Sequence, residues 1–312
     1  MRTAIALVTA AFVIAGAPAG AQAPLFDFHS AFWVNLHHYL HALARSGGPL
    51  NESLPDSATA SEREAWDAAV ASYRERFGKR SLLFDEELVT ANQELMRLES
   101  AETLSASVPE SMRTALTSAA PIYRAHVWSA HDKANRAAIT VARALVAKYG
   151  ATIAPRLAAS FDSTWPAQPI RIDVVHDAGP PGNAYTVSEP THITMAASDP
   201  RYQGIDVLEI LFHEASHRWD AILMTEVDEA AKQQNVRPPR DLWHALLFYN
   251  AGAITSDALA AAGIRDYQIY ADKQKLFGRV WQMRPAIARH WPAFLAGTIS
   301  RKDAIARIVR EP

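Results

Sequence analysis

Most of this chain alternates apolar and polar residues with the period of an α-helix. The first such stretch places its apolar residues on one helical face, at Phe32, Leu36, Tyr39, Leu40 and Leu43. A polar loop that contains glycine and proline follows over 46–59. Ser61 and Glu64 then have the spacing of a capping box, so we expect a second helix to begin there and to end at Gly78.

Helical patterns continue through the first half of the chain. We expect helices over about 85–98 and 109–119, and a long helix that starts after Pro121 and ends at Gly150. Together with the first two helices, these segments predict an N-terminal helical lobe over residues 22–165.

After this lobe the pattern changes to that of short β-strands. Apolar and polar residues alternate in Ile170–Val175, which is typical of a strand with one buried face. Residues 184–187 and 191–197 are two further β-rich segments, and helical periodicity returns from Ile205 to the end. The sequence therefore predicts an α+β fold, predominantly helical, with a small mixed sheet beside the helix that follows it.

Residues 1–21 have the pattern of a secretory signal peptide. Arg2 gives a positive start, residues 4–15 are nearly all apolar, and the small residues from Ala19 to Ala21 favour cleavage after Ala21. The apolar run is too short and too rich in alanine for a membrane span, and no other stretch of that length is free of charge. We expect an exported protein, periplasmic or secreted, with no stable membrane insertion after cleavage.

Composition narrows the chemistry. The chain has no cysteine, which excludes disulfides, thiolate metal ligands and a cysteine nucleophile together. Hydrophobic residues make up 49% of the chain, enough for one large core or two lobes. With 31 basic and 33 acidic residues, the charge balance gives no reason to expect a nucleic-acid partner. The sequence also lacks the Gly-x-Ser-x-Gly elbow of serine hydrolases and a glycine-rich phosphate loop.

The strongest chemical signal is the pentapeptide His-Glu-Ala-Ser-His at 213–217. The segment 205–232 around it has no proline or glycine and has helical spacing, so we expect one continuous helix. Residues at i and i+4 lie on one helical face, which lets His213 and His217 bind a common metal ion. Glu214 lies beside that ion, where its carboxylate can take a proton from a bound water. The spacing predicts Zn²⁺ as the cofactor.

A catalytic zinc site needs a third protein ligand, which the motif does not supply. On a continuous helix, Glu226 would lie about 13 Å along the axis from His217, too far to bind the same ion. The next helix, expected over 242–252 and stopped there by a glycine, is almost wholly apolar and should be buried. A buried histidine needs a partner, because an unpaired polar group costs on the order of 1–3 kcal/mol. We predict His244 as the third ligand, with Asp257 as the alternative.

This arrangement resembles the zincin metallopeptidases over about residues 168–260. A strand at 191–197 precedes the motif, and a later helix carries the separate ligand candidate, which is similar to the gluzincin branch. The resemblance implies that His213 and His217 bind zinc and that Glu214 is the general base. Gluzincins use a glutamate as third ligand within an Asn-Glu signature, which this sequence lacks. The extended metzincin pattern of a later glycine and histidine is also absent.

The resemblance also bears on the organisation of the chain. We place a zincin-like catalytic core at 166–265, between the helical lobe at 22–165 and a C-terminal helical segment at 266–312. In zincins, an edge strand borders the cleft and pairs with the backbone of an extended peptide, so 191–197 is a candidate for this role, or else an ordinary strand of the sheet. The two flanking segments look like those of uncharacterised exported bacterial proteins.

The expected function is that of a zinc metallopeptidase with a peptide or protein substrate. Tyr249, on the same predicted helix as His244, is a candidate hydrogen-bond donor to the developing oxyanion, or else a core aromatic. The alternative is a non-catalytic exported protein that binds metal or a partner through the same cleft. A helical interaction protein with a chance motif is the third possibility.

A second group of histidines lies among aromatic residues near the N-terminus. Its members are His29, His37, His38 and His41. His37 and His41 share the i, i+4 spacing but have no glutamate next to the first histidine, so we expect them to pack or to line a cleft. We expect His131, in the long helix, to lie on a solvated face.

Overall fold

The computed structural model describes residues 23–46, 54–98, 103–179 and 183–311 of the 312-residue chain. The predicted signal peptide, residues 1–21, lies outside the described residues. In chain order the elements are β1 (Phe26–His29), α1 (Phe32–Ser46), α2 (Ala60–Arg76), α3 (Glu86–Arg97), α4 (Glu110–His126), α5 (Trp128–Ala159), β2 (Ile170–Val175), β3 (Ala184–Ser188), β4 (Thr191–Ala196), η2 (Pro200–Tyr202), α6 (Asp206–Ser216), η3 (His217–Trp219), α7 (Asp220–Gln234), α8 (Leu242–Ala261), α9 (Tyr270–Lys273), α10 (Leu276–Arg279), α11 (Arg284–Leu295) and α12 (Arg301–Arg310).

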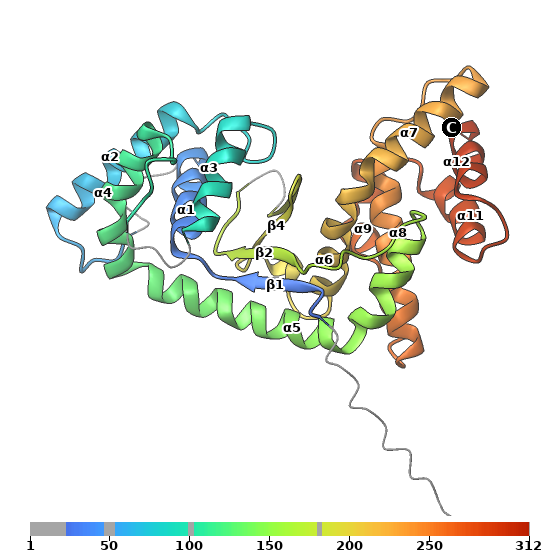
Figure 1. Cartoon of the computed structure of the whole chain (residues 1–312), viewed down its shortest axis with the longest axis horizontal. Helices are drawn as coiled ribbons and strands as arrows, with labels where there is room; N and C mark the ends of the chain where they lie inside the picture. Colours follow the sequence, from blue (N-terminus) through green and yellow to red (C-terminus); the bar gives the residue numbers. More distant parts are fainter. Residues whose placement is uncertain (1–22, 47–53, 99–102, 180–182, 312) are drawn as a thin grey trace, which may run out of the picture.

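The fold is α+β and predominantly helical, which confirms the prediction from the sequence (Figure 1). Four strands form one mixed sheet in the order β1-β2-β4-β3. Strands β1, β2 and β4 run parallel, and β3 pairs antiparallel with β4. In Figure 1, the sheet lies between the helices α1–α4 and the helices that follow it in sequence.

The edge strands of the sheet are β1 and β3, so of the two possibilities for 191–197 the edge strand is wrong. β4 occupies that segment and lies inside the sheet, because it pairs with β2 on one side and with β3 on the other. In the hairpin from β3 to β4, the outermost strand is therefore β3, which contacts α6. The sequence pattern does not predict β1, because its four residues are too few for a clear alternation.

Each face of the sheet covers a separate apolar core. Ile172, Val174 and Ile193 belong to the core that includes α5, α6 and α8. Val175 and Tyr185 belong to the core formed by α1–α4. Odd and even positions along β2, β3 and β4 therefore face different cores, as the two-residue period of a strand requires.

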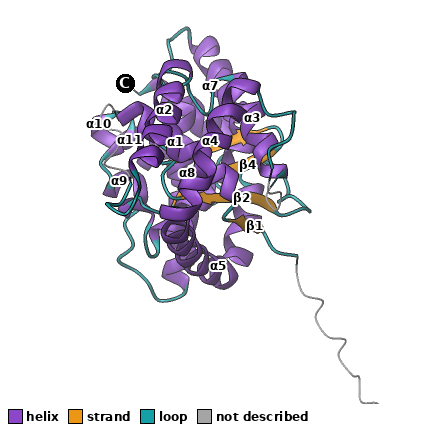
Figure 2. Cartoon of the chain, turned by 90° about the vertical axis from the view of Figure 1, so that its left-hand side faces the viewer, coloured by secondary structure: helices purple, strands orange, loops and turns teal. Residues whose placement is uncertain are grey.

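The helix α5 lies beneath the strands in both views (Figures 1 and 2). By length and apolar composition alone it could cross a membrane. Its residues Ile153 and Leu157 are fully buried against the core that α6 and α8 share. A core helix of a folded domain meets the same test of length and composition. Both α5 and β1 fall within the predicted lobe at 22–165, yet they contribute to the core of the C-terminal half.

The capping box of α2 lies two residues earlier than predicted. The Thr59 hydroxyl accepts a hydrogen bond from the backbone N–H of Glu62, and the Glu62 carboxylate accepts one from the backbone N–H of Thr59. Ser61 and Glu64 have the same spacing but lie inside the helix. The pattern S/T-x-x-E occurs twice in overlap here, so spacing alone does not choose between the two pairs.

Two predicted helix ends are also wrong. α4 continues through Pro121 to His126, and α5 continues through Gly150. A Cβ atom on Gly150 would lie 2.7 Å from the side chain of Leu25. This glycine therefore permits the close approach of the N-terminal segment to α5 and does not end the helix.

Candidate metal centre

The helix that carries the pentapeptide motif ends at its second histidine. α6 gives way to the 3₁₀ turn η3 at His217, and α7 follows, so the predicted single helix over 205–232 is wrong. Trp219 in this turn stacks on Phe161 with 5.0 Å between ring centroids. α7 then packs on α12. These tertiary contacts accompany an interruption of the α-helix that the sequence pattern does not show.

Three histidines converge between α6 and α8. The candidate ligand atoms of His213, His217 and His244 all lie within 4.8 Å of one another. The His244 ring centroid is 5.4 Å from that of His213 and 5.1 Å from that of His217. Among the residues that the structure describes, this is the one such cluster of three or more potential ligands. The structure thus brings the predicted third ligand to the predicted pair.

The acidic alternatives for the third ligand lie elsewhere. Asp257 is at the surface, where its carboxylate accepts a hydrogen bond from Arg156 at 2.8 Å. Glu226 forms a buried ion pair with Arg301 of α12, at 2.8 and 2.9 Å. Neither carboxylate is a member of the histidine cluster.

The environment of His213 and His244 favours neutral imidazoles. Burial, followed by the proximity of His217 and His244, lowers the pKa of His213 well below its usual value. Burial and the neighbouring His217 lower the pKa of His244 to about 3. Neutral imidazole has a lone pair for a metal ion, and a divalent cation needs deprotonated ligands. The donor set therefore fits a metal such as zinc, which binds readily to imidazole nitrogen.

Aromatic side chains surround the three imidazoles. Phe248 stacks on the His213 ring at 3.5 Å between centroids, and Trp243 stacks on the His244 ring at 5.0 Å. Trp281 contacts the other side of the cluster, 5.4 Å from His244. These contacts restrict the orientation of the rings and exclude water from part of the site.

Glu214 is buried beside the histidines, with 6% of its surface exposed. The Thr186 hydroxyl on β3 donates to the Glu214 Oε2 atom at 2.7 Å. Burial raises the pKa of Glu214, while His217 and the hydrogen bond from Thr186 lower it. A carboxylate in this setting is a stronger base than one in water.

The structure does not bring Tyr249 to the cluster. Its ring lies beneath the guanidinium of Arg284, 5.0 Å from the ring centroid, and 6.5 Å from Phe277. Five helical residues separate it from His244, a rotation of about 140° around the helix axis. Tyr249 thus faces a different side of α8 from the histidine.

Two other tyrosines, which the sequence pattern does not single out, lie within electrostatic reach of Glu214. Tyr202 ends η2 and Tyr270 begins α9, with 6.0 Å between their ring centroids. Burial raises the pKa of each phenol, and the Glu214 carboxylate adds to this effect. No local signal marks these tyrosines, because neither lies on an element that carries the motif.

A second carboxylate holds Tyr270 in place. Glu209, one turn before His213 on α6, accepts hydrogen bonds from the Tyr270 backbone N–H at 2.9 Å and from the Tyr267 hydroxyl at 2.6 Å. Burial raises the pKa of Glu209 to about 7 despite these bonds. A Cβ atom on Gly252 would lie 2.7 Å from Glu209 Oε1, so this glycine allows the close approach. α8 continues through Gly252 to Ala261, and the predicted end of the helix there is wrong.

The N-terminal histidines occupy the other core. His37, His38 and His41 are buried on α1. The His37 Nδ1 atom lies 3.1 Å from the Tyr73 hydroxyl. His131 is also buried, contrary to the expected solvated face, and its ring stacks on His176 at 3.7 Å between centroids. These side chains pack within the α1–α4 half, on the far face of the sheet from the metal candidate.

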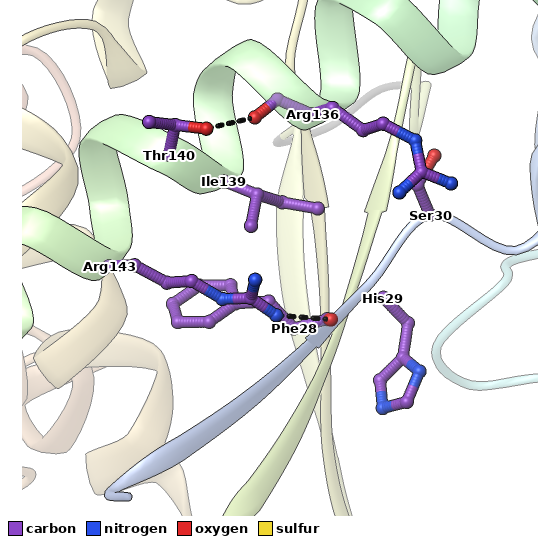
Figure 3. A pocket seen from close by; sticks show the side chains of 7 residues that line it. All are labelled: Phe28, His29, Ser30, Arg136, Ile139, Thr140 and Arg143. Atoms are coloured by element: carbon purple, nitrogen blue, oxygen red, sulfur yellow. Dashed lines mark hydrogen bonds between the residues drawn. The ribbon is translucent and has the colours of Figure 1, made fainter.

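A surface hollow of about 300 Å³ lies at the β1 edge of the sheet, between β1 and α5 (Figure 3). The two arginines that line the hollow already form a hydrogen bond or an ion pair within the protein. Arg143 donates to the Phe28 carbonyl at 3.1 Å, and Arg136 pairs with Asp132 at 2.7 Å. The strands β2 and β4 separate this edge from β3 and Glu214. We therefore assign the hollow no part in the metal centre.

Comparison with known proteins does not place the chain in a family. No protein-family model matches it, and neither the curated proteins nor the solved structures contain a match.

Proposed function

We propose that this chain is a zinc-dependent hydrolase, a zincin-like metallopeptidase that cleaves peptide bonds. The supporting observation is the convergence of His213, His217 and His244 within 4.8 Å, with the buried Glu214 next to the first of them. Three imidazoles can supply the three protein ligands of a catalytic zinc site, and an adjacent carboxylate can supply the base. Zinc bound there would polarise the scissile carbonyl and lower the pKa of the attacking water.

In this proposal, Glu214 is the general base and then the general acid. Its carboxylate takes a proton from the water that attacks the scissile carbonyl, and returns it to the leaving nitrogen. Burial raises its pKa, which brings its basicity closer to what proton transfer at neutral pH needs. The hydrogen bond from Thr186 occupies Oε2 and leaves Oε1 for the water.

The hydroxyls of Tyr202 and Tyr270 replace that of Tyr249 as the proposed donors to the oxyanion. Their raised pKa values keep both phenols protonated at neutral pH, so each has a hydrogen to donate. A donor that is fixed before the reaction stabilises the developing negative charge without reorganisation. The bond from Glu209 to the Tyr270 backbone provides such fixation.

A peptide substrate is supported by the position of β3. This edge strand contacts the motif helix α6, and its outer edge is not paired within the sheet. An extended peptide can add to such an edge through backbone hydrogen bonds. The signal-like residues 1–21 support a site of action outside the cytoplasm.

The third ligand distinguishes this site from both zincin branches considered above. An imidazole, His244, takes the place of the gluzincin glutamate, and it comes from α8, not from the extended motif of metzincins. We therefore propose likeness to the zincins in general and assign the chain to neither branch.

The test is hydrolysis of a peptide library by the purified protein. We expect activity that a chelator removes and that added zinc restores, and we expect Glu214→Gln to abolish turnover while zinc remains bound. A non-catalytic metal-binding protein would bind zinc equally well without cleaving any peptide. Full activity of zinc-loaded Glu214→Gln would falsify the assignment of the general base.

A further inference from the structure

Two adjacent residues of β3 connect the two cores. Tyr185 and Thr186 point to opposite faces of the sheet, as neighbours on a strand must. Tyr185 faces α1 and lies 2.8 Å from the Nε2 atom of His38, whereas Thr186 faces α6 and Glu214. Both side chains are buried, at 8% and 6% exposure. The strand next to the candidate general base is therefore held from both sides.

The hydrogen-bond direction on the α1 side follows from the backbone. His38 Nδ1 lies 2.7 Å from the Val34 carbonyl, which can only accept, so Nδ1 carries the hydrogen. Burial lowers the pKa of His38 to about 4, so the ring is neutral and Nε2 is an acceptor. The Tyr185 hydroxyl therefore donates to His38. This bond ties β3 to the α1–α4 half of the molecule.

On the α6 side, one hydroxyl hydrogen has two possible acceptors. The Thr186 Oγ1 atom lies 2.7 Å from Glu214 Oε2 and 2.9 Å from the Glu214 carbonyl oxygen. A hydrogen bond to an ionised carboxylate is stronger than one to a neutral carbonyl, and the shorter distance agrees with this choice. The second carboxylate oxygen, Oε1, remains for another partner.

We propose that Thr186 is a positioning residue for Glu214. Its hydroxyl selects the carboxylate rotamer that presents Oε1 to the attacking water, and the Tyr185–His38 bond fixes the strand from which it acts. The inference rests on the proposed function, because it assumes that Glu214 is the general base. It also gives the α1–α4 half a role in the site, since His38 belongs to that half.

The experiment compares three purified, zinc-loaded variants in peptide hydrolysis. Thr186→Val has nearly the same shape but no hydroxyl, and we expect kcat to fall about 10- to 100-fold with KM changed less than about threefold. Thr186→Ser keeps the hydroxyl and should recover most of kcat. Thr255→Val on α8 is the matched control: its buried hydroxyl has no hydrogen-bond partner among the described residues, so kcat should not change.

Zinc content and melting temperature accompany each kinetic measurement. A kcat for folded, zinc-loaded Thr186→Val within twofold of the parent value would overturn the proposal, as would failure of Thr186→Ser to restore kcat. If Thr186→Val does not fold, Tyr185→Phe serves instead: it removes the anchor to His38, and we expect a smaller fall in kcat with unchanged zinc binding. A parent-like kcat in Tyr185→Phe would then count against the proposal.

The outcome is separable from that of the proposed function. Activity that survives in Glu214→Gln would contradict the assignment of Glu214 as general base, and the proposed function with it. Loss of activity in Glu214→Gln, together with full activity in Thr186→Val, leaves the proposed function standing and removes only the role of Thr186.

Discussion

The carboxylate of Glu209 accepts a hydrogen bond from the backbone N–H of Tyr270 at 2.9 Å. Glu209 lies on α6, one turn before His213, and Tyr270 lies 61 residues further along the chain. The bond therefore holds the start of α9 against the helix that carries the motif. Burial at 0% exposure makes this contact sensitive to the protonation of the carboxyl group.

We predict that Glu209→Gln changes the pH dependence of stability. The folded-state pKa of about 7 lies above the ordinary 4.5, so folding favours the protonated acid. The stabilisation of the folded state by protonated Glu209 is fully present below about pH 4.5. It is lost as the pH rises through 7, which lowers the free energy of unfolding by about 3 kcal/mol. Gln cannot titrate, so the loss should be absent in the variant. Urea unfolding of both proteins from pH 4.5 to 8 measures the free energy of unfolding against pH. Parallel curves for the parent and the variant would contradict the prediction.

The two tyrosine candidates give opposite expectations for catalysis. Tyr270→Phe removes a hydroxyl within reach of Glu214, and we expect kcat to fall about 10²-fold, as for a lost oxyanion donor. Tyr249→Phe removes the hydroxyl of a ring that lies beneath Arg284 and not at the cluster, and we expect kcat within about twofold of the parent. Peptide hydrolysis at saturating substrate measures both. Equal losses in the two variants would show that neither hydroxyl has a specific role.

Zinc affinity distinguishes the candidates for the third ligand. His244→Ala removes a member of the cluster and should weaken zinc binding at least about 100-fold, because two ligands remain. Asp257→Ala alters only a surface pair with Arg156 and should leave the affinity unchanged. Competition with a chromogenic chelator measures both dissociation constants. Tight zinc binding by His244→Ala would require another third ligand.

The buried histidines of the α1–α4 half predict sensitivity to mild acid. Burial lowers the pKa of His38 to about 4, and burial together with His176 lowers that of His131 to about 3. The unfolded chain therefore binds protons first as pH falls below 6.5, so stability decreases from there toward pH 4. Each such histidine contributes up to about 1.4 kcal/mol per pH unit.

His131→Phe tests this origin of the acid sensitivity. The phenyl ring can still stack on His176, but it cannot titrate. We expect the free energy of unfolding to fall less steeply between pH 6.5 and 4 in the variant than in the parent. The difference in slope should correspond to at most one fewer proton taken up on unfolding. Chemical denaturation across that range gives the slope. An unchanged slope would assign the acid sensitivity to other groups.

Local patterns in the sequence were sufficient for the fold class and for part of the site. The strands β2, β3 and β4 follow from short apolar runs between turns, and the pair His213 and His217 follows from the geometry of one helical turn. The approach of His244 could be anticipated because a histidine in an apolar helix needs a partner. All of these depend on residues a few positions apart.

Other local signals gave wrong boundaries. Gly150 and Gly252 were interpreted as helix ends, but each lacks a side chain because another segment approaches closely there. The break after α6 had no proline or glycine to mark it. Packing of Trp219 on Phe161, and of α7 on α12, accompanies the break there.

The sequence by itself determined the chemistry that is available: two imidazoles and a carboxylate on one helix, a helical chain with a small sheet, and no thiols. Only the tertiary structure decided which strand is the edge, which threonine donates a hydrogen bond to Glu214, and which tyrosines lie within electrostatic reach of it. The physical reason is range. Helical periodicity and turn chemistry act over a few residues, whereas these contacts join segments that are 28 residues apart, as for Thr186 and Glu214, or more.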